Sequence, residues 1–321
     1  MKLPFEKFKQ EIIIKHESET DASKGCNPHD RSVKELLEKG IIILDKPSGP
    51  TSHMAVDYFK NILGLKKAGH SGTLDPGVTG VLPIAIGKAT RITHSLLTAG
   101  KEYICLMHMH SDHSDEELNK VLEEFTGTIT QLPPKKSAVK RQLRKRTIYY
   151  IKVLDRVDND VLFLVGCEAG TYIRKLVHDI GLALGSGAHM AELRRTKAGP
   201  FIEEESKTLQ DIADAYHYYK QGDESILKSY LHPIERGVEH LRKVWIHDGA
   251  VQTICQGASL KSPGVSKISA DISVGELVAV MTLKDELVMV GEARMNSHDL
   301  KISKRGVAVK PKQVFMEPGT Y

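Results

Sequence analysis

The sequence predicts an α+β protein with two domains, a larger domain of mixed helices and strands followed by a small, mostly β domain. The chain has 321 residues, which is long for one domain. Strand-like and helix-like patterns are mixed from Gly40 to about Leu241, and short β-prone runs separated by turn residues follow. We expect an N-terminal extension over residues 1–36, a first domain over 37–240 and a second over 241–317.

The composition is that of a soluble globular protein, with 40% hydrophobic and 27% charged residues. No apolar run approaches the roughly 18 residues that a membrane span requires, and the N-terminus lacks the apolar core of a secretory signal. The cysteines are scattered and include no C-x-x-C pair: Cys26, Cys105, Cys167 and Cys255. This pattern predicts a reducing, cytoplasmic location and argues against disulfides and a zinc site.

The first domain should begin with a strand, a loop and a helix. Ile41–Leu44 is a short apolar run typical of a buried strand, and the following LDKPSGPTS is punctuated by proline and glycine. The helix should have Ser52 as its N-cap, Gly64 at its end, and an inner face formed by Val56, Phe59 and Leu63.

The next elements are a shaped loop, two strands and a helix. Residues 69–80 (GHSGTLDPGVTG) contain four glycines and a proline, and the apolar VLPIAIG after them is strand-like. Tyr103–Met109 alternates between two faces, as a strand does. Ser114 with Glu117 forms a capping box, which opens an amphipathic helix that should end at Gly127.

A hairpin and another helix complete the first domain's pattern. Two strand-like runs, Thr147–Leu154 and Val161–Cys167, flank the turn residues Asp158–Asp160. Thr171 should cap the helix that follows, whose apolar residues recur at helical spacing: Ile173, Leu176, Val177 and Ile180.

Positive charge is concentrated between Lys135 and Arg146 (KKSAVKRQLRKR), where seven of twelve residues are basic and none is acidic. A single cluster of this kind can be an ordinary solvated face. Several smaller basic clusters occur as well, separated by acidic stretches such as Asp115–Glu117 and Glu203–Glu205. This arrangement favours a surface that binds a polyanion, with nucleic acid as the expected partner.

Asp75 is the first candidate for chemistry, because it lies between Gly72 and Gly77 and directly before Pro76. A residue before proline favours extended geometry, and glycines let the backbone approach a substrate closely. The acid could therefore project into a cleft; a plain Asp-Pro turn is the alternative. The chain has neither a G-x-x-x-x-G-K-[ST] loop for nucleotides nor a G-x-S-x-G elbow for acyl transfer.

Arg174 is the second candidate. It lies in the first turn of its helix, where the helix dipole favours acids. This position favours a carboxylate partner such as Asp75, with a solvated surface position as the alternative. A third group, His108, His110, Asp112 and His113, matches no zinc spacing, so we prefer a loop or interface role for it over metal binding.

Six segments together resemble the TruB-type pseudouridine synthases, most closely the archaeal dyskerin-like branch that works with guide RNA. The segments occur in the family's order: GIIILDKPSGPTS (40–52), GHSGTLDPGVTGVLPIAIGKATR (69–91), KEYICLMHMH (101–110), PPKKSAVKRQLRKRTIYY (133–150), GTYIRKLVHDIG (170–181) and LRRTKAGPF (193–201). The stretch from about Leu241 to Met316 resembles a PUA domain, which binds RNA in this family.

The resemblance implies roles for individual residues. Asp75 matches the essential aspartate, Tyr103 the aromatic that stacks on the target base, and Arg174 the arginine paired with that aspartate. Leu193 matches an apolar wall of the uracil pocket. His70 matches a histidine that helps flip or hold the nucleotide in stand-alone tRNA enzymes. The motif that supports the active-site loop is matched by Lys46 and Pro47.

The basic segment falls where the family has a mobile loop that closes over substrate RNA. The resemblance therefore implies RNA contacts for its basic residues Lys140, Arg141, Arg144, Lys145 and Arg146. Lys135 is a departure, because the family has an apolar residue there. The implied fold is a mixed, largely antiparallel sheet flanked by helices, with a central catalytic cleft and no metal or organic cofactor.

The implied reaction isomerises uridine to pseudouridine in rRNA, tRNA or both. The carboxylate acts as nucleophile at C1′ or as base at C2′, and must be ionised, with an ordinary pKa of ~3.9. The target uridine must leave its stack, at a cost of a few kcal/mol. Implied partners are an H/ACA guide RNA, a small zinc-ribbon protein, a Gar-type protein and a kink-turn-binding ribosomal protein. No association with a membrane is expected.

Two alternatives stay open. A stand-alone synthase would modify the T-loop uridine of tRNA without a guide, but the bacterial type carries a large insertion for which residues 90–170 offer no obvious room. A non-catalytic RNA-binding subunit could keep the fold, but such a relative would be free to lose Asp75, Tyr103 or Arg174, and all three are present.

Overall fold

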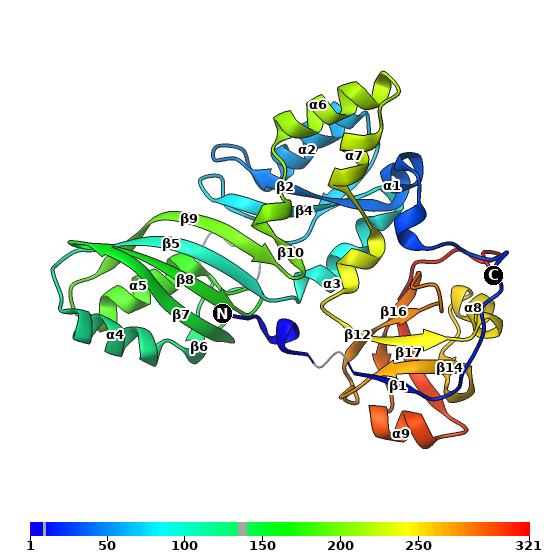
Figure 1. Cartoon of the computed structure of the whole chain (residues 1–321). Helices are drawn as coiled ribbons and strands as arrows, with labels where there is room; N and C mark the ends of the chain where they lie inside the picture. Colours follow the sequence, from blue (N-terminus) through cyan, green and yellow to red (C-terminus); the bar gives the residue numbers. More distant parts are fainter. Residues whose placement is uncertain (9–10, 134–139) are drawn as a thin grey trace.

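The computed structural model describes residues 1–8, 11–133 and 140–321. These residues form two β-sheets, which Figure 1 shows as two bodies side by side, with the chain's N-terminal segment running along both. The mixed α+β class expected from the sequence is confirmed. None of the helices in the described ranges has the length and apolarity that crossing a membrane requires.

The larger sheet has ten strands, and its order shows that the middle is formed by segments distant in sequence. β4 and β9 pair in parallel, whereas the other strand pairs in the described part of this sheet are antiparallel. From one edge to the other the strands are β11 (Leu231–Pro233), β2 (Gly40–Lys46), β4 (Thr79–Ile86), β9 (Ala188–Ala198), β5 (Lys101–Met109), β8 (Asp160–Cys167), β7 (Arg144–Val157) and β6 (Gly127–Gln131), with β3 (Ala68–His70) beside β4 and β10 (Phe201–Ile202) beside β9.

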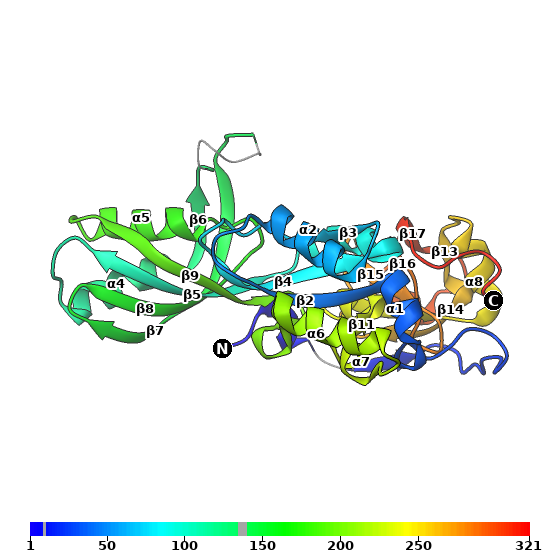
Figure 2. The same ribbon diagram turned by 90° about the horizontal axis from the view of Figure 1, so that it is seen from above.

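Helices cover the two halves of this sheet separately. One buried apolar cluster joins β2 and β4 to α1 (Val33–Lys39), α2 (Ser52–Leu63), α6 (Leu209–Lys220) and α7 (Ser225–Tyr230). A second cluster joins β5, β8 and β9 to α4 (Asp115–Glu124) and α5 (Ile173–Ala183). In Figure 2, α2 and α5 lie on the same side of the sheet, on either side of its middle. A short helix, α3 (Thr93–Leu97), precedes β5.

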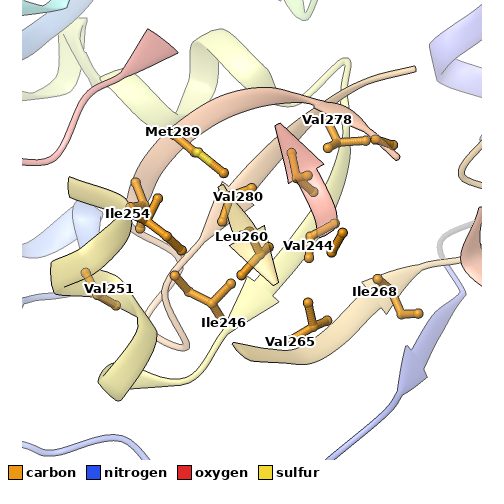
Figure 3. Packing of buried hydrophobic residues seen from close by; sticks show 14 of the residues in the cluster. Val244, Ile246, Val251, Ile254, Leu260, Val265, Ile268, Val278, Val280 and Met289 are labelled. Atoms are coloured by element: carbon orange, nitrogen blue, oxygen red, sulfur yellow. The ribbon is translucent and has the colours of Figure 1, made fainter. Parts of the chain in front are cut away.

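The smaller sheet curves around its own core, which Figure 3 shows from close by. Buried aliphatic side chains of the strands, such as Val244 and Val280, pack against Val251 and Ile254 of a helix. In order the strands are β1 (Ile12–Ile14), β14 (Val265–Ser269), β12 (Arg242–Ile246), β15 (Leu277–Met281), β16 (Leu287–Ala293), β17 (Val307–Val314) and β13 (Leu260–Lys261), with α8 (Asp248–Cys255) and α9 (Ser297–Ile302).

The N-terminal extension contributes a strand to this smaller sheet. Ile12–Ile14 pairs antiparallel with β14 and forms β1, the edge strand. The three isoleucines are half-buried or exposed, so the pairing rests on backbone hydrogen bonds more than on burial. Such a short strand has too little pattern of its own to be recognised in sequence, because its partner lies more than 250 residues away.

Most local predictions for the larger domain agree with the structure. The Ser114–Glu117 capping box is present, Gly64 ends α2 with φ 64°, and the turn at Asp158 joins β7 to β8. Two predicted caps were wrong by one residue. The N-cap of α2 is Thr51, whose hydroxyl accepts from the Met54 N–H at 3.1 Å. The N-cap of α5 is Tyr172, and the Thr171 hydroxyl donates instead to the Glu168 carbonyl at 2.7 Å.

Candidate active site

Asp75 lies in the aspartate loop (residues 71–78), which joins β3 to β4 in the middle of the larger sheet. The loop ends where β4 and β9 pair in parallel, at Thr79 with Arg194 and Gly80 with Arg195. Gly80 has φ +101°, and a β-carbon there would lie 2.2 Å from the carbonyl oxygen of Arg195. Glycine is therefore required at this position for the two strands to meet beside the loop.

Lys46 holds the aspartate loop from behind. It is fully buried at the end of β2, and its Nζ donates to the carbonyl oxygens of Pro47, Pro76 and Val78 at 2.9, 3.1 and 2.9 Å. These bonds use all three donors of the ammonium group. Burial lowers the pKa of Lys46, and the nearby carboxylate of Asp75 opposes that change. Its burial favours support of the loop over direct contact with RNA.

Ser52 fixes the loop at a second point. Its buried hydroxyl donates to the Leu74 carbonyl at 2.9 Å and accepts from the Leu74 N–H at 2.8 Å. The N–H of Gly49 also donates to the Pro76 carbonyl at 2.9 Å. The residues on both sides of Asp75 are thus held by the segment after β2, so the position of the Asp75 backbone is set by three separate contacts.

Asp75 and Arg174 form an ion pair, with 3.0 Å between Arg174 Nη2 and Asp75 Oδ2. Arg174 is the second residue of α5, so the pair joins the start of this helix to the aspartate loop. Both side chains are open to solvent, with 66% of Arg174 and 57% of Asp75 exposed. An ion pair this exposed contributes little to stability, but it holds the carboxylate beside an open surface.

Tyr103 and Leu193 lie on neighbouring strands of the same sheet, β5 and β9, next to this pair. Both are half-buried at the edge of the apolar cluster that α5 covers. Burial raises the pKa of the Tyr103 hydroxyl; Arg195 opposes this rise and the carboxylate of Asp75 adds to it. The fold therefore brings Asp75, Tyr103 and Arg174 together from three different elements, with Leu193 on the strand beside Tyr103.

His70, at the end of β3, lies on the other side of the loop. Its ring packs edge-on against His53 of α2, with 5.0 Å between the centroids, and both line a cavity of about 380 Å³. Burial, together with His53 and Arg195, lowers the pKa of His70 to about 4. The imidazole is therefore neutral at neutral pH, and its buried Nδ1 has no hydrogen-bond partner in the described residues.

The basic segment divides into a strand and a loop. Arg144, Lys145 and Arg146, expected in a mobile loop, are instead the first residues of β7 and pair with β6. Arg146 is half-buried and lies 3.6 Å from the Glu168 carboxylate. Lys140 and Arg141 precede the strand and are exposed. Lys135 lies outside the described residues. Figure 2 shows this hairpin standing out from the sheet on the side of α2 and α5.

The histidines near residue 110 gather at the outer end of β5 and β9. His108 pairs with Asp160 at 2.7 Å, and His110 Nε2 lies 3.1 Å from Nδ1 of His189. Asp112 pairs with Arg156 at 2.8 Å, and His113 bonds to Ser186 at 2.7 Å. Within the described ranges, no group of three or more His, Cys, Asp or Glu is arranged to hold a metal ion.

Two residues important to the site's geometry escaped the sequence reasoning. Ser52 was expected only as a helix cap, and Arg195 only as part of a basic cluster. Arg195 is 1% exposed, and its Nε and Nη2 donate to the carbonyls of Val81 and Gly72 at 2.7 and 3.2 Å. No local pattern distinguishes it from the half-buried Arg194 beside it, because only the strand register decides which of the two points inward.

Comparison with known families covers nearly the whole chain in four adjacent parts. Residues 1–56 match the DKCLD domain, and 60–173 match the N-terminal domain of TruB family pseudouridylate synthases. Residues 174–239 match the C-terminal domain of tRNA pseudouridylate synthase B, and 242–315 match the PUA domain.

Similar proteins share about half of the residues over their full length. A probable tRNA pseudouridine synthase B of Methanopyrus kandleri is 54% identical, covering 100% of this chain and 95% of that protein. One of Pyrococcus horikoshii is 52% identical, covering 98% and 95%.

Solved structures show the same fold. The chain matches a structure of a Cbf5–Nop10–Gar1 complex with a TM-score of 0.94, 52% identity and coverage of 98% and 96%. It matches a structure of an H/ACA RNP bound to a substrate RNA containing 2′-deoxyuridine with a TM-score of 0.93, 49% identity and coverage of 100% and 99%. With this identity over its whole length, and with Asp75, Tyr103 and Arg174 gathered beside one loop, the chain belongs to the TruB family of pseudouridine synthases.

Proposed function

We propose that this protein is the catalytic subunit of an H/ACA guide-RNA particle and isomerises uridine to pseudouridine in rRNA, tRNA or both. The observation that carries the proposal is the Asp75–Arg174 ion pair on an open surface beside Tyr103 and Leu193. The pair holds the carboxylate of the family's aspartate beside an open surface, where both chemical routes need it.

We assign the roles as follows. Asp75 acts on the ribose, at C1′ as nucleophile or at C2′ as base, and Arg174 orients its carboxylate through the ion pair. Tyr103 stacks on the flipped uracil, because aromatic faces hold bases that have left their stack. Leu193 forms the apolar wall beside it. His70, neutral at neutral pH, can contact RNA only as an uncharged ring or through a hydrogen bond.

RNA binding is assigned to positive charge on two parts of the chain. Lys140 and Arg141 are exposed in the connection from β6 to β7, and Lys145 is exposed in β7 between the half-buried Arg144 and Arg146. The PUA domain is the second part. We retain 37–240 and 241–317 as the limits of the catalytic and PUA domains, with 1–36 as the extension.

Protein partners are proposed from the complexes that similar structures contain: a Nop10-type protein and a Gar1-type protein. An open apolar surface supports protein partners. Ile104 and Leu106 of β5 pair across the strands with Leu164 and Leu162 of β8. All four are half-exposed, and they alternate with Cys105, Met107 and Phe163, which α4 and α5 cover. They therefore lie on the opposite face, where such a patch marks an interaction site.

The four cysteines of the protein are free, which supports a cytoplasmic location.

The deciding experiment measures pseudouridine formation by wild type and Asp75→Ala on two substrates. The first is a guide RNA with its target and partner proteins, and the second is naked tRNA. Guide-dependent activity that is lost with Asp75→Ala supports the proposal. RNA binding without activity by either protein on either substrate would leave only a binding subunit.

A stand-alone tRNA synthase is the second candidate, because similar proteins are named probable tRNA pseudouridine synthase B. Activity on the T-loop of naked tRNA, without guide RNA, would support that function. The two activities are compatible in one protein, so both substrates should be tested with the same preparation.

A further inference from the structure

Arg195 is a buried cation that has no carboxylate partner. It is 1% exposed and is the largest fully buried side chain among the described residues. Buried arginines are ordinarily paired with acids, because an unpaired charge in the interior is costly. Among the described residues, no carboxylate lies within 4.0 Å of its guanidinium, which donates to the carbonyls of Val81 and Gly72. Tyr103 pairs with Arg195 across the strands, and the two side chains interact electrostatically. Neutral acceptors therefore hold a charge that remains uncompensated.

A strand irregularity aims this side chain at the active site. Glu102 of β5 pairs with Lys197 of β9, but the next residue, Tyr103, pairs with Arg195, so Thr196 is an extra residue. Without this bulge Arg195 would lie opposite Ile104 and would point to the other face of the sheet, because strand faces alternate. Bulges re-aim side chains in this way beside active sites.

The surroundings of Arg195 are positive as well. Lys46 and Lys101 are buried nearby, and Lys101 donates to the carbonyls of Leu96, Leu97 and Ala99. Burial, and secondly the charge of Arg195, lowers the pKa of Lys101 to about 7. Gly72, whose carbonyl accepts from Arg195, has φ +84°, in the left-handed region that favours glycine.

We propose that Arg195 is a positioning residue of the synthase, which ties the hydroxyl of Tyr103 to Gly72 of the aspartate loop and keeps positive charge behind the uracil. The Tyr103 ring, which stacks on the base, and the Asp75 carboxylate are thereby held in a fixed relative position. When the C1′–N1 bond breaks, the uracil takes its electron pair and becomes an anion. Meanwhile Asp75 either bonds to C1′ or holds the C2′ proton. The charge leaves the uracil when C5 bonds to C1′, since Asp75 is then released as a carboxylate or returns the proton to C2′, and the C5 proton moves to N1. An uncompensated cation behind Tyr103 favours the anion in between.

The proposal rests on the assignment of Asp75 and Tyr103 to the active site, so the test includes Asp75→Ala. The variants are Arg195→Met, Arg195→Lys and Tyr103→Phe, with Arg194→Met as the matched control. Arg194 is the next residue of β9, points to the opposite face and pairs with Asp45 and Glu203. Single-turnover pseudouridine formation and substrate-RNA affinity are measured in the reconstituted particle, after thermal unfolding confirms that each variant is folded.

We expect Arg195→Met to lower the single-turnover rate constant roughly a hundredfold, the size of effect that a small misplacement of reacting groups produces. Arg195→Lys keeps the positive charge but loses the planar guanidinium and its several donors, so its rate constant should lie between those of Arg195→Met and wild type. Substrate affinity should change little, and Arg194→Met should react at the wild-type rate. Because the two residues act as a unit, Arg195→Met combined with Tyr103→Phe should be no slower than Arg195→Met alone.

A folded Arg195→Met protein with the wild-type rate would overturn the proposal, as would equal losses in Arg195→Met and Arg194→Met. If Arg195→Met does not fold, Tyr103→Phe decides, because it removes only the hydroxyl: an unchanged rate contradicts the proposal and a reduced rate supports it. Full activity in Asp75→Ala would instead remove the active-site assignment on which the proposal rests.

Discussion

At the scale of single residues, the side chains that meet at the aspartate loop divide into an exposed pair and a buried support. Asp75 and Arg174 are mostly open to solvent, whereas Lys46, Ser52 and Arg195 are almost fully buried. An exposed ion pair contributes between about 0 and 1 kcal/mol to stability. The cost of changing it should therefore appear in the reaction and not in the fold.

The first prediction separates these two effects. Arg174→Ala should nearly abolish turnover, roughly a hundredfold or more, while guide-RNA affinity is retained and the free energy of unfolding changes by less than about 1 kcal/mol. Chemical denaturation and single-turnover assays measure the two quantities. Lys24→Ala removes a comparably exposed pair with Asp21, far from the site, and should keep full activity. Wild-type rates in Arg174→Ala would remove Arg174 from the active site.

The second prediction concerns His240, which is buried where the two domains meet. Its Nε2 donates to the Ser95 carbonyl at 3.0 Å, and burial lowers its pKa to about 4. Above pH 6.5, the ordinary pKa, both folded and unfolded forms are neutral, and stability does not depend on this group. As pH falls from about 6.5 to about 4, the unfolded chain binds the proton first, so stability is lost.

The loss from His240 should reach at most about 3 kcal/mol at pH 4, since each unit of pKa difference corresponds to about 1.4 kcal/mol. Denaturant unfolding of wild type and His240→Asn between pH 7 and pH 4 measures it. The asparagine variant should be less stable at pH 7 but should lose less between the two pH values. Parallel curves for the two proteins would exclude His240 as the group responsible.

At the scale of elements, the start of α2 has two adjacent hydroxyl residues with different functions. Thr51 caps the helix, and Ser52 holds the backbone of Leu74 in the aspartate loop. The sequence predicted one cap here but placed it on the wrong residue. The adjacent residues provide a matched pair of variants, in which the same kind of change affects either the helix or the loop.

The third prediction uses that pair. Thr51→Ala should lower the free energy of unfolding by about 1 kcal/mol, the usual value of a helix cap, with the activity of the folded protein unchanged. Ser52→Ala should cost a similar amount, because it leaves the buried Leu74 N–H and carbonyl unpaired, but should also slow catalysis. Equal activity in the two folded variants would show that the Ser52 contact does not matter for the loop.

The fourth prediction concerns the basic residues before and within β7. Replacing the exposed Lys140, Arg141 and Lys145 by alanine should weaken substrate binding and reduce its salt dependence. For three lost phosphate contacts on single-stranded RNA the slope of log K against log salt should fall by about 2. A triple variant of exposed lysines elsewhere, Lys120, Lys220 and Lys228, is the control. Equal salt dependence of binding for both triple variants would show that Lys140, Arg141 and Lys145 do not contact the substrate RNA.

At the scale of the whole molecule, the two domains and the extension form one packed unit. One apolar cluster contains Ile41 and Val81 of the larger sheet together with Trp245, Met281 and Phe315 of the smaller domain. The extension contacts both, because Leu3 is fully buried near Gly100 and β1 pairs with β14. The packing thus sets the position of the PUA domain relative to the aspartate loop.

The fifth prediction tests the ion pair at this junction. Arg31 of the extension binds Glu235 through two hydrogen bonds of 2.7 and 3.0 Å, and lies 3.9 Å from Glu286 of β15–β16. Both side chains of the first pair are nearly buried, at 12% and 10% exposed. Arg31→Met should cost about 3–5 kcal/mol, because it leaves buried carboxylates without their cation.

Lys88→Met is the control for Arg31→Met. It removes the exposed Lys88–Glu317 pair, which also joins the two domains, and should cost less than about 1 kcal/mol. Denaturant unfolding of the two variants gives the comparison. Equal small losses would mean that Arg31 is not needed to hold the junction.

The sequence by itself determined the two domains, the strands and helices with clear periodicity, and the motif residues Asp75, Tyr103, Arg174 and Leu193. These follow from short patterns and from ordered motifs, which can be recognised without knowing which distant segments pack against them. Only the tertiary structure decided the β1–β14 pairing of the extension, the strand position of Arg144 to Arg146, and the inward orientation of Arg195. Each depends on a partner far away in sequence, and a shift of one residue in register reverses which face a side chain occupies.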